Sequence, residues 1–231
     1  MPTERRALVT GSSSGIGRAI AGRLLADGWR VAGLDLAPAS LSQPAFEAVT
    51  VDLCDARAAE SAAREAGPIE AFVHAAGVLR VGALGELRAE DGELMWRLHV
   101  QAATRIANVV IPAMAAANHG RVVLIGSRVA QGLAGRGQYA ATKAALVALA
   151  RSWAAEVVAS GVTVNVVSPA ATQTAMLGDP ARNAAPPKLP PLGRLIQPGE
   201  VAALVGFLLS PEAAAITGQD IPICAGATLP H

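Results

Sequence analysis

Residues 6–17 read RALVTGSSSGIG, and they constrain the architecture of the chain more strongly than any other segment. The apolar run from Arg6 to Thr10 predicts a strand, and the segment from Arg18 to Gly28 has the apolar spacing of a helix. Three glycines between them let the backbone turn tightly and approach a ligand closely. The helix start offers unpaired N–H groups and a positive dipole end to a pyrophosphate. Strand, glycine turn and helix together predict a dinucleotide-binding site.

A single carboxylate predicts which dinucleotide is bound. The next apolar run, residues 30–35, ends in Asp35, which follows Gly17 at close to the roughly 20-residue spacing at which an acid hydrogen-bonds an adenosine ribose. Asp35 would repel a 2′-phosphate, no arginine or lysine follows nearby, and the turn carries Ser14 instead of a basic residue. The sequence therefore predicts NAD rather than NADP. The alternative is that Asp35 is only a helix N-cap or turn residue.

A second group of residues predicts proton transfer. The segment QYAATK, residues 138–143, begins an amphipathic helix in which Tyr139 and Lys143 are four residues apart and share a face. A phenol titrates near pH ~10, and an ammonium about one helical turn away favours the phenolate. Ser127 follows the apolar run 121–126, a predicted strand buried on both faces, and its hydroxyl is suited to hold a substrate oxygen. Tyr-x-x-x-Lys also occurs on solvated helix faces, so the pattern indicates a catalytic pair only together with the glycine turn.

These segments together resemble the classical short-chain dehydrogenase/reductase family over nearly all of the 231 residues. Further matches are Asp52 within VDL at 51–53, an Ala-Gly pair after the fourth predicted strand, and Asn165 within VNVVSP at 164–169. The resemblance implies that Tyr139 is the general acid/base and that Ser127 orients the substrate oxygen. It also implies that Lys143 holds the nicotinamide ribose and lowers the pKa of the tyrosine.

The resemblance further implies a set of cofactor contacts distributed along the chain. They are Gly11, Ser13, Ser14, Gly15, Ile16, Gly17, Asp35, Asp52, Leu53, Ala75, Ala76, Gly77, Tyr139, Lys143, Pro169, Ala170, Ala171 and Thr174.

One departure from the family pattern concerns the proton path. The family commonly has an asparagine in the long central helix that anchors a water-mediated relay to the lysine, and here that position is His99. Histidine can hydrogen-bond and transfer a proton near neutral pH, so His99 is a candidate catalytic residue. The alternative is a histidine that only packs beneath the site.

Three other departures concern structure. His74 stands where the family usually has an asparagine, and we expect it to tie the central strands together by hydrogen bonds. The segment Ile223 to Gly226 lacks the usual acidic residue and second glycine, which puts the family's C-terminal turn in doubt. Ser127 lies one residue closer to Tyr139 than is usual, which implies a shorter loop.

The order of predicted elements is that of a single doubly wound α/β domain of Rossmann type, with seven parallel strands and helices on both faces. Strands are predicted near 6–10, 30–35, 47–51, 70–74, 121–126, 162–167 and 219–223. Such a sheet carries its ligands at the carboxyl ends of the strands. Residues 175–192 contain five prolines and are predicted to form a mobile lid over the substrate. The alternative is a connector without that role.

Composition narrows the class of partner. Of the residues 52% are hydrophobic and only 3% aromatic, which predicts an aliphatic core around a buried sheet. A net charge of +1, with lysine and arginine scattered, favours neither nucleic acid nor a membrane surface. The first residues carry no leader pattern and no apolar run is long enough to cross a bilayer, so a cytoplasmic protein is expected. Two distant cysteines predict neither a disulfide nor a metal site. The resemblance implies a homotetramer or homodimer.

These observations predict an NAD-dependent oxidoreductase that transfers a hydride between the nicotinamide and a small secondary alcohol or ketone, with a polyol, sugar or hydroxy acid favoured. Arg128 follows Ser127 and is suited to a carboxylate or sugar hydroxyl, although an arginine at a strand end is usually solvated. Two alternatives remain: an NADP-linked 3-ketoacyl-thioester reductase, and a non-catalytic nucleotide-sensing relative.

Overall fold

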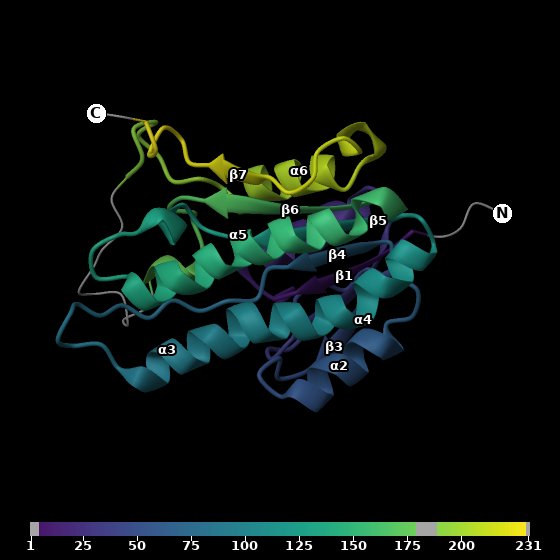
Figure 1. Ribbon diagram of the computed structural model, residues 1–231, viewed down its shortest axis with the longest axis horizontal. Helices are drawn as coiled ribbons and strands as arrows, with labels where there is room; N and C mark the ends of the chain where they lie inside the picture. Colours follow the sequence, from purple (N-terminus) through teal and green to yellow (C-terminus); the bar gives the residue numbers. More distant parts are fainter. Residues whose placement is uncertain (1–4, 179–188, 230–231) are drawn as a thin grey trace.

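The centre of the computed structural model, which describes residues 5–178 and 189–229, is a seven-stranded sheet in the order β3-β2-β1-β4-β5-β6-β7 (Figure 1). Every neighbouring pair of strands is parallel. The strands are β1 (Arg6–Thr10), β2 (Arg30–Asp35), β3 (Phe46–Thr50), β4 (Ala71–His74), β5 (Gly120–Ile125), β6 (Val162–Pro169) and β7 (Asp220–Ile223). All seven predicted strands are confirmed, each within one or two residues of its predicted bounds.

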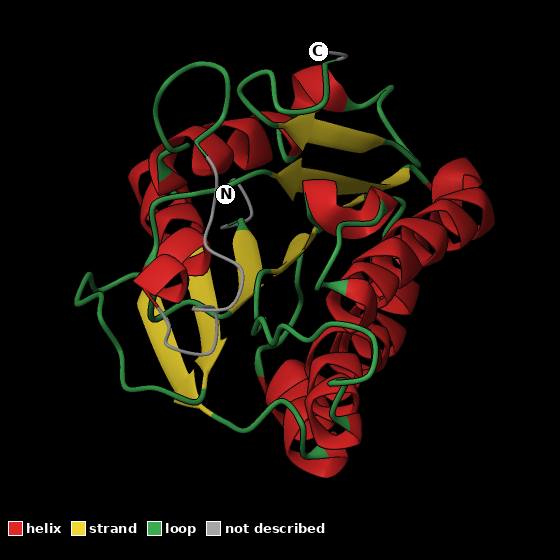
Figure 2. Ribbon diagram, turned by 90° about the vertical axis from the view of Figure 1, so that its left-hand side faces the viewer, coloured by secondary structure: helices red, strands yellow, loops and turns green. Residues whose placement is uncertain are grey.

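Helices cover both faces of the sheet (Figure 2). They are α1 (Gly15–Ala26), α2 (Ala56–Glu65), α3 (Ala89–Trp96), α4 (Ala102–Ala116), α5 (Gly137–Val157) and α6 (Pro198–Leu208). Leu8 of β1 packs in one apolar core with α2, α4 and α5, whereas its neighbours Ala7 and Val9 pack in the other with α1 and α6. Alternate residues of a strand point to opposite faces, so one central strand supplies both cores.

The long central helix differs from a regular α-helix at one place. Between α3 and α4 the chain forms a π-helical turn, η1 (Arg97–Gln101), which contains His99. Single π turns within α-helices are rare and are frequent at functional sites. The turn therefore marks the position where the sequence departs from the family pattern.

The strand order determines where a ligand can bind. β1 pairs with β2 on one side and with β4 on the other. The connection after β1 therefore runs toward β2, whereas the connection after β4 runs the opposite way, toward β5. In parallel sheets such a switch point leaves a crevice at the carboxyl ends of the strands. The glycine turn between β1 and α1 lies at this point.

Two other expectations bear on the outline of the molecule. Of the predicted lid at 175–192, residues Ala175–Gly178 form a short 3-10 turn, and residues 179–188 lie outside the described residues. No helix in the described part of the chain has the length and apolar character that crossing a membrane requires.

Candidate active site

The glycine turn is packed so tightly that two of its positions accept only glycine. Gly11 has φ +70°, and a Cβ on it would lie 2.8 Å from the backbone nitrogen of Ala76. A Cβ on Gly17 would lie 2.0 Å from the carbonyl oxygen of Gly11. The N–H of Gly11 donates to the carbonyl of Leu34 at 2.8 Å. The turn is thus held against the ends of β2 and β4.

The first turn of α1 is suited to an anion. Ser14 is the N-cap residue, but its side chain makes no capping hydrogen bond, so the first N–H groups of the helix are left to a ligand. Gly15 follows with φ +51°, a conformation that side chains disfavour. The turn fits the pyrophosphate of a dinucleotide, with the positive end of the α1 dipole behind it.

Asp35 fixes this turn and also leaves a negative charge beside it. Its carboxylate accepts hydrogen bonds from the backbone N–H of Ser13 at 2.9 Å and of Ala37 at 2.8 Å. The N–H of Val51 donates to the carbonyl of Asp35, which brings Asp52 and the end of β3 to the same side. Asp35 therefore does stabilise the turn, the role that was given above as the alternative to a ribose contact. It is compatible with a ribose contact, because the carboxylate charge remains at the end of β2.

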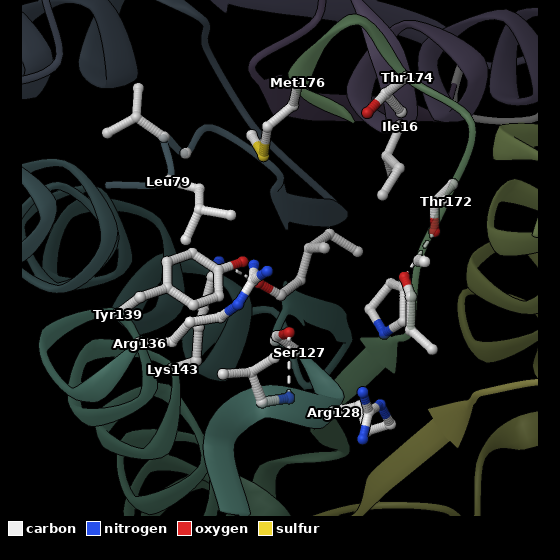
Figure 3. A pocket seen from close by; sticks show the side chains of 18 of the residues that line it. Ile16, Leu79, Ser127, Arg128, Arg136, Tyr139, Lys143, Thr172, Thr174 and Met176 are labelled. Carbon is white, nitrogen blue, oxygen red and sulfur yellow. Dashed lines mark hydrogen bonds between the residues drawn. The ribbon is translucent and has the colours of Figure 1, made fainter. Parts of the chain in front are cut away.

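A cavity of about 360 Å³ opens at the carboxyl ends of β4, β5 and β6 (Figure 3). Its lining brings together the predicted catalytic residues and part of the predicted cofactor contacts, among them Pro169, Ala171 and Thr174, which were predicted to lie against the nicotinamide. These are Ile16, Ala75, Gly77, His99, Ser127, Tyr139, Lys143, Pro169, Ala170, Ala171 and Thr174. The remaining predicted contacts do not line it and lie toward the glycine turn and the ends of β2 and β3. They are Gly11, Ser13, Ser14, Gly15, Gly17, Asp35, Asp52, Leu53 and Ala76.

Lys143 lies at the bottom of this cavity. Its ammonium group donates to the carbonyl of Ile125 at 2.8 Å and lies 5.8 Å from the centre of the Tyr139 ring. The side chain is buried, and burial lowers the pKa of Lys143 from 10.5 to about 7, because the charged form loses its hydration. One N–H of the ammonium is bonded to β5, and the other two, which have no recorded acceptor among the described residues, can donate to a ligand.

Ser127 is presented by the short turn that follows β5, η2 (Arg128–Gln131), of which it is the N-cap residue. Its hydroxyl oxygen accepts the N–H of Val129 at 3.2 Å. That bond fixes the oxygen and leaves the hydroxyl hydrogen to donate to a substrate oxygen. The shorter loop to Tyr139 does not separate the two residues, because both line the cavity.

His99 is bonded through both of its ring nitrogens. The N–H of Val78 donates to Nε2 at 3.0 Å, so the ring proton is assigned to Nδ1, which donates to the hydroxyl of Thr142 at 2.9 Å. That hydroxyl in turn donates to the carbonyl of Tyr139 at 2.8 Å. Burial, with Lys143 nearby, holds the pKa of His99 well below its usual value of 6.5. Proton relay through the ring stays a prediction, and the geometry favours a positioning role because each nitrogen already has a partner.

His74 joins β1 to β4. Thr10 accepts the N–H groups of Ala75 and Ala76 at 3.0 and 3.1 Å, so its hydroxyl hydrogen is assigned to the contact with Nδ1 of His74 at 3.0 Å. This is the tie between central strands that the sequence predicted. The ring is buried, and that burial lowers the pKa of His74 to about 3, outweighing the nearby carbonyls of Leu98 and His99, which favour the charged form.

The sequence reasoning missed two polar residues of the cavity, Arg136 and Thr172. Arg136 lines the cavity, three residues before Tyr139, and Thr172 lines it between two predicted cofactor contacts. The position of Arg136 one turn before the tyrosine was a readable signal. The role of Thr142 could not be predicted from the sequence, because it depends on the hydrogen bond with His99, which comes from another helical segment.

Comparison with known proteins identifies the family. A family model described as enoyl-(acyl carrier protein) reductase matches residues 11–228. The 3-oxoacyl-acyl-carrier-protein reductase FabG of Escherichia coli strain K12 is 35% identical over 239 residues, which span 95% of this chain and 96% of that relative. The oxidoreductase UcpA of Escherichia coli O157:H7 is 33% identical over 254 residues, which span 99% and 96%. The chain therefore belongs to the short-chain dehydrogenase/reductase family.

Solved structures have the same fold. A variant of the actinorhodin polyketide ketoreductase with NADPH superposes with a TM-score of 0.87 at 27% identity, covering 98% of both chains. The ligand-free aldohexose dehydrogenase of Thermoplasma acidophilum gives a TM-score of 0.90 at 24% identity, covering 99% of this chain and 95% of that one, and this likeness concerns the fold alone. The chain is thus an oxidoreductase of a family that binds a nicotinamide cofactor.

Proposed function

We propose that this oxidoreductase uses NAD and interconverts a small secondary alcohol and its ketone. The observation that carries the proposal is the arrangement of Ser127, Tyr139 and Lys143 around one cavity beside a glycine turn that fits a dinucleotide. A bound nicotinamide would supply the hydride acceptor for the alcohol carbon. Side chains of this protein would transfer the proton, orient the alcohol and stabilise the developing charge.

In the oxidative direction, Tyr139 is the general base. Its side chain lines the cavity, and as the phenolate it would take the hydroxyl proton, becoming the phenol, as the hydride leaves the carbon that bears the hydroxyl. Ser127 donates its free hydroxyl hydrogen to the same oxygen, which orients the alcohol and stabilises the charge that develops on it. In the reductive direction the two residues act in reverse, and Tyr139 returns the proton to the ketone oxygen.

Lys143 has two tasks that its position allows. Its ammonium group is fixed by Ile125 and lies beneath the Tyr139 ring, where its charge favours the phenolate. Its other N–H groups are suited to hold the nicotinamide ribose. Burial makes this electrostatic effect stronger than it would be in water, because the surrounding dielectric is low.

The preference for NAD is supported by the end of β2. The Asp35 carboxylate is held beside the glycine turn, and the described residues that follow it, Leu36 to Thr50, contain no lysine or arginine. A 2′-phosphate would meet the Asp35 carboxylate, and the segment that follows supplies no lysine or arginine to offset the repulsion. An NADP-linked 3-oxoacyl-thioester reductase is the second candidate. The name of the Escherichia coli relative and the NADPH of the ketoreductase structure favour it.

Tyr139→Phe tests the chemistry. The variant should lose turnover by about 1000-fold or more and should still bind NAD, because only a proton-transfer group is removed. Turnover is followed by NADH absorbance with a panel of secondary alcohols, and binding by the fluorescence of bound NADH. An active phenylalanine variant removes Tyr139 from the mechanism.

The cofactor is tested by steady-state kinetics with NAD and NADP on the same alcohol. We expect kcat/KM to favour NAD by about 100-fold, on the order of 3 kcal/mol, from repulsion by Asp35. Asp35→Ser should lower the ratio of kcat/KM with NAD to kcat/KM with NADP. Equal use of NADP by the wild-type protein would favour the thioester reductase instead.

We also propose that the protein works as a homo-oligomer. Analytical ultracentrifugation decides between a homodimer and a homotetramer.

A further inference from the structure

One wall of the cavity is aliphatic. Large apolar side chains from three separate segments line it, the segments that follow β4, β5 and β6. They are Leu79, Val129, Leu133, Met176 and Leu177. Figure 3 shows Leu79 and Met176 on the side of Ser127 away from Arg128 in that view. An alcohol whose hydroxyl is held by Ser127 would therefore bring the rest of its carbon skeleton against hydrocarbon.

Backbone bonds hold this aliphatic wall in shape. Leu79 is only 4% exposed. The N–H of Gly82 donates to the carbonyl of Gly135 at 3.0 Å, which joins the loop that carries Leu79 to the loop that carries Leu133. Met176 lies in the short 3-10 turn beyond β6. A pocket with such preformed apolar walls binds apolar groups at little cost in ordering.

Three polar side chains of the cavity that the proposed hydride transfer does not use already have partners within the protein. Both ring nitrogens of His99 are hydrogen-bonded. The hydroxyl of Thr172 donates to the carbonyl of Ala170 at 3.0 Å, and Arg136 is engaged in an interaction within the chain. A second hydroxyl of the substrate, placed against the aliphatic wall, would lose its hydrogen bonds to water without gaining a protein partner.

We propose that the substrate is a short aliphatic secondary alcohol, an alkan-2-ol whose only polar group is the reacting hydroxyl; this inference rests on the proposed function. The cavity of about 360 Å³ must also admit the nicotinamide end of the cofactor, which favours a short chain. The sequence favoured a polyol, sugar or hydroxy acid, whereas the side chains of the aliphatic wall favour hydrocarbon. A carboxylate on the substrate is the alternative that Arg128 would support.

The first test compares three alcohols that share the same skeleton around the reacting carbon. The full chain is assayed with NAD and with pentan-2-ol, butane-1,3-diol or 3-hydroxybutyrate. We expect kcat/KM for pentan-2-ol to exceed the other two values by about 10- to 100-fold, because the polar ends find no partner at the aliphatic wall. From propan-2-ol through butan-2-ol to pentan-2-ol, kcat/KM should rise about 4-fold per methylene. A preference for the diol or the acid, or a flat series, overturns the proposal.

Two variants locate the contact. Leu79→Ala should lower kcat/KM for pentan-2-ol by about 10-fold and that for propan-2-ol by less than about threefold, because only the longer chain reaches the aliphatic wall. Leu133 is 42% exposed, so Leu133→Gln should fold, and it should lower the ratio of pentan-2-ol to diol by at least about threefold. The second variant decides the matter if the first does not fold.

The matched control is Leu84→Gln. Leu84 is 93% exposed and lies outside the cavity lining, so the same exchange there should leave the ratio of pentan-2-ol to diol as in the wild type. An equal change in this control would mean that the ratio does not depend on the aliphatic wall, which overturns the assignment to Leu133.

An acyl chain is a second source of the same aliphatic chemistry. The N-acetylcysteamine thioester of 3-hydroxybutyrate is therefore assayed beside the alkan-2-ols, with NAD and with NADP. We expect the thioester to be the poorer substrate. A kcat/KM above that of every alkan-2-ol would assign the aliphatic wall to an acyl chain and overturn the free alcohol.

Binding separates this inference from the proposed function. Pentan-2-one and 4-hydroxybutan-2-one are titrated by calorimetry into the complex with NAD, which cannot reduce them. Pentan-2-one should bind at least about 10-fold more tightly, and Leu133→Gln should lower that preference by at least about threefold. Equal binding of both ketones, or an unchanged preference in the variant, overturns the aliphatic site. Failure of every alcohol to reduce NAD overturns the proposed function, and the ketone titration still decides the aliphatic site.

Discussion

The floor of the cavity disfavours charged side chains, whereas the rim carries them. His99 and Lys143 line the floor, and His74 is close enough to interact electrostatically with both; all three are buried, and burial lowers the pKa of each because it disfavours the charged form. The rim, residues 128–136 and 169–177, carries the guanidinium groups of Arg128 and Arg136. The floor can therefore set the reaction, whereas the rim can select the substrate that reaches it.

The two regions also differ in how their side chains are held. Each floor residue is bonded to backbone or to a hydroxyl from a neighbouring element, as in the path from Val78 through His99 and Thr142 to Tyr139. The rim is built from loop segments that follow β5 and β6. Changes at the floor should thus affect turnover with every substrate, and changes at the rim should affect some substrates only.

The largest expected effect comes from removing the charge at the floor with Lys143→Met. The variant loses the ammonium that favours the phenolate and that is suited to hold the ribose, so kcat/KM should fall by about 1000-fold for alkanols and acids alike. A fall confined to acids would mean that Lys143 serves the substrate anion and would remove the distinction between floor and rim.

The same variant should lose part of the pH dependence of stability. The pKa of Lys143 is lowered from 10.5 to about 7 on folding, so the unfolded chain binds more protons between these values and wild-type stability should rise with pH across this window. From about pH 7 to pH 9.5 the contribution is about 3 kcal/mol. Urea unfolding at both pH values measures it, and the methionine variant should lack this part of the rise. Parallel curves for the two proteins would contradict a buried, shifted lysine.

The buried histidines predict sensitivity to acid. The folded pKa of His74 is about 3 against 6.5 for a free histidine, so the unfolded chain takes up a proton first and stability falls as the pH drops below 6.5. At pH 5 the loss from His74 is about 2 kcal/mol, and His99 adds to it in the same direction. Urea unfolding between pH 7 and pH 5 measures the fall, and His74→Asn should flatten it. An equally steep fall in that variant would assign the acid response to other groups.

A smaller effect is expected from His99, through the residues it positions. His99→Leu removes the acceptor for Val78 and the donor to Thr142, and should lower kcat by roughly 10-fold with little change in KM, because Tyr139 is less well placed. His99→Asn should retain most of the activity with an unchanged pH profile of kcat. A shifted profile in the asparagine variant would instead support proton relay through the imidazole.

The fold could be predicted from the sequence because its signals are local. Apolar runs and the glycine turn determine the strands and the first helix without reference to the rest of the chain. The seven strands and their parallel arrangement follow from such signals. The π turn at residues 97–101 could not be predicted, because its cause is not visible in any local residue pattern.

The site was predictable in part. Ser127, Tyr139 and Lys143 were recognisable by type and spacing, and the structure brings them to one cavity. The bonding of His99 depends on Val78 and Thr142, which reach it from different elements, so its neutral state could not be read from sequence. The burial of Arg136 likewise depends on its pairing with the loop at Gly82.

The smallest effect expected concerns backbone strain behind the rim. In the glycine turn, the positive-φ positions Gly11 and Gly15 are glycines. By contrast, Ala225 has φ +49° in the segment that directly follows β7, whose last residue, Ile223, accepts the N–H of Ala170 in the rim. This is the turn where the family's second glycine is missing. A left-handed alanine costs about 1–2 kcal/mol, and glycine relieves most of that at some cost in unfolded-state entropy. Ala225→Gly should therefore raise the free energy of unfolding by about 0.5–1 kcal/mol in urea titrations. Ala227→Gly, which is not at positive φ, is the control and should destabilise slightly. Equal losses in both variants would show that the alanine is not strained, and strain would then no longer distinguish the segment behind the rim from the glycine turn.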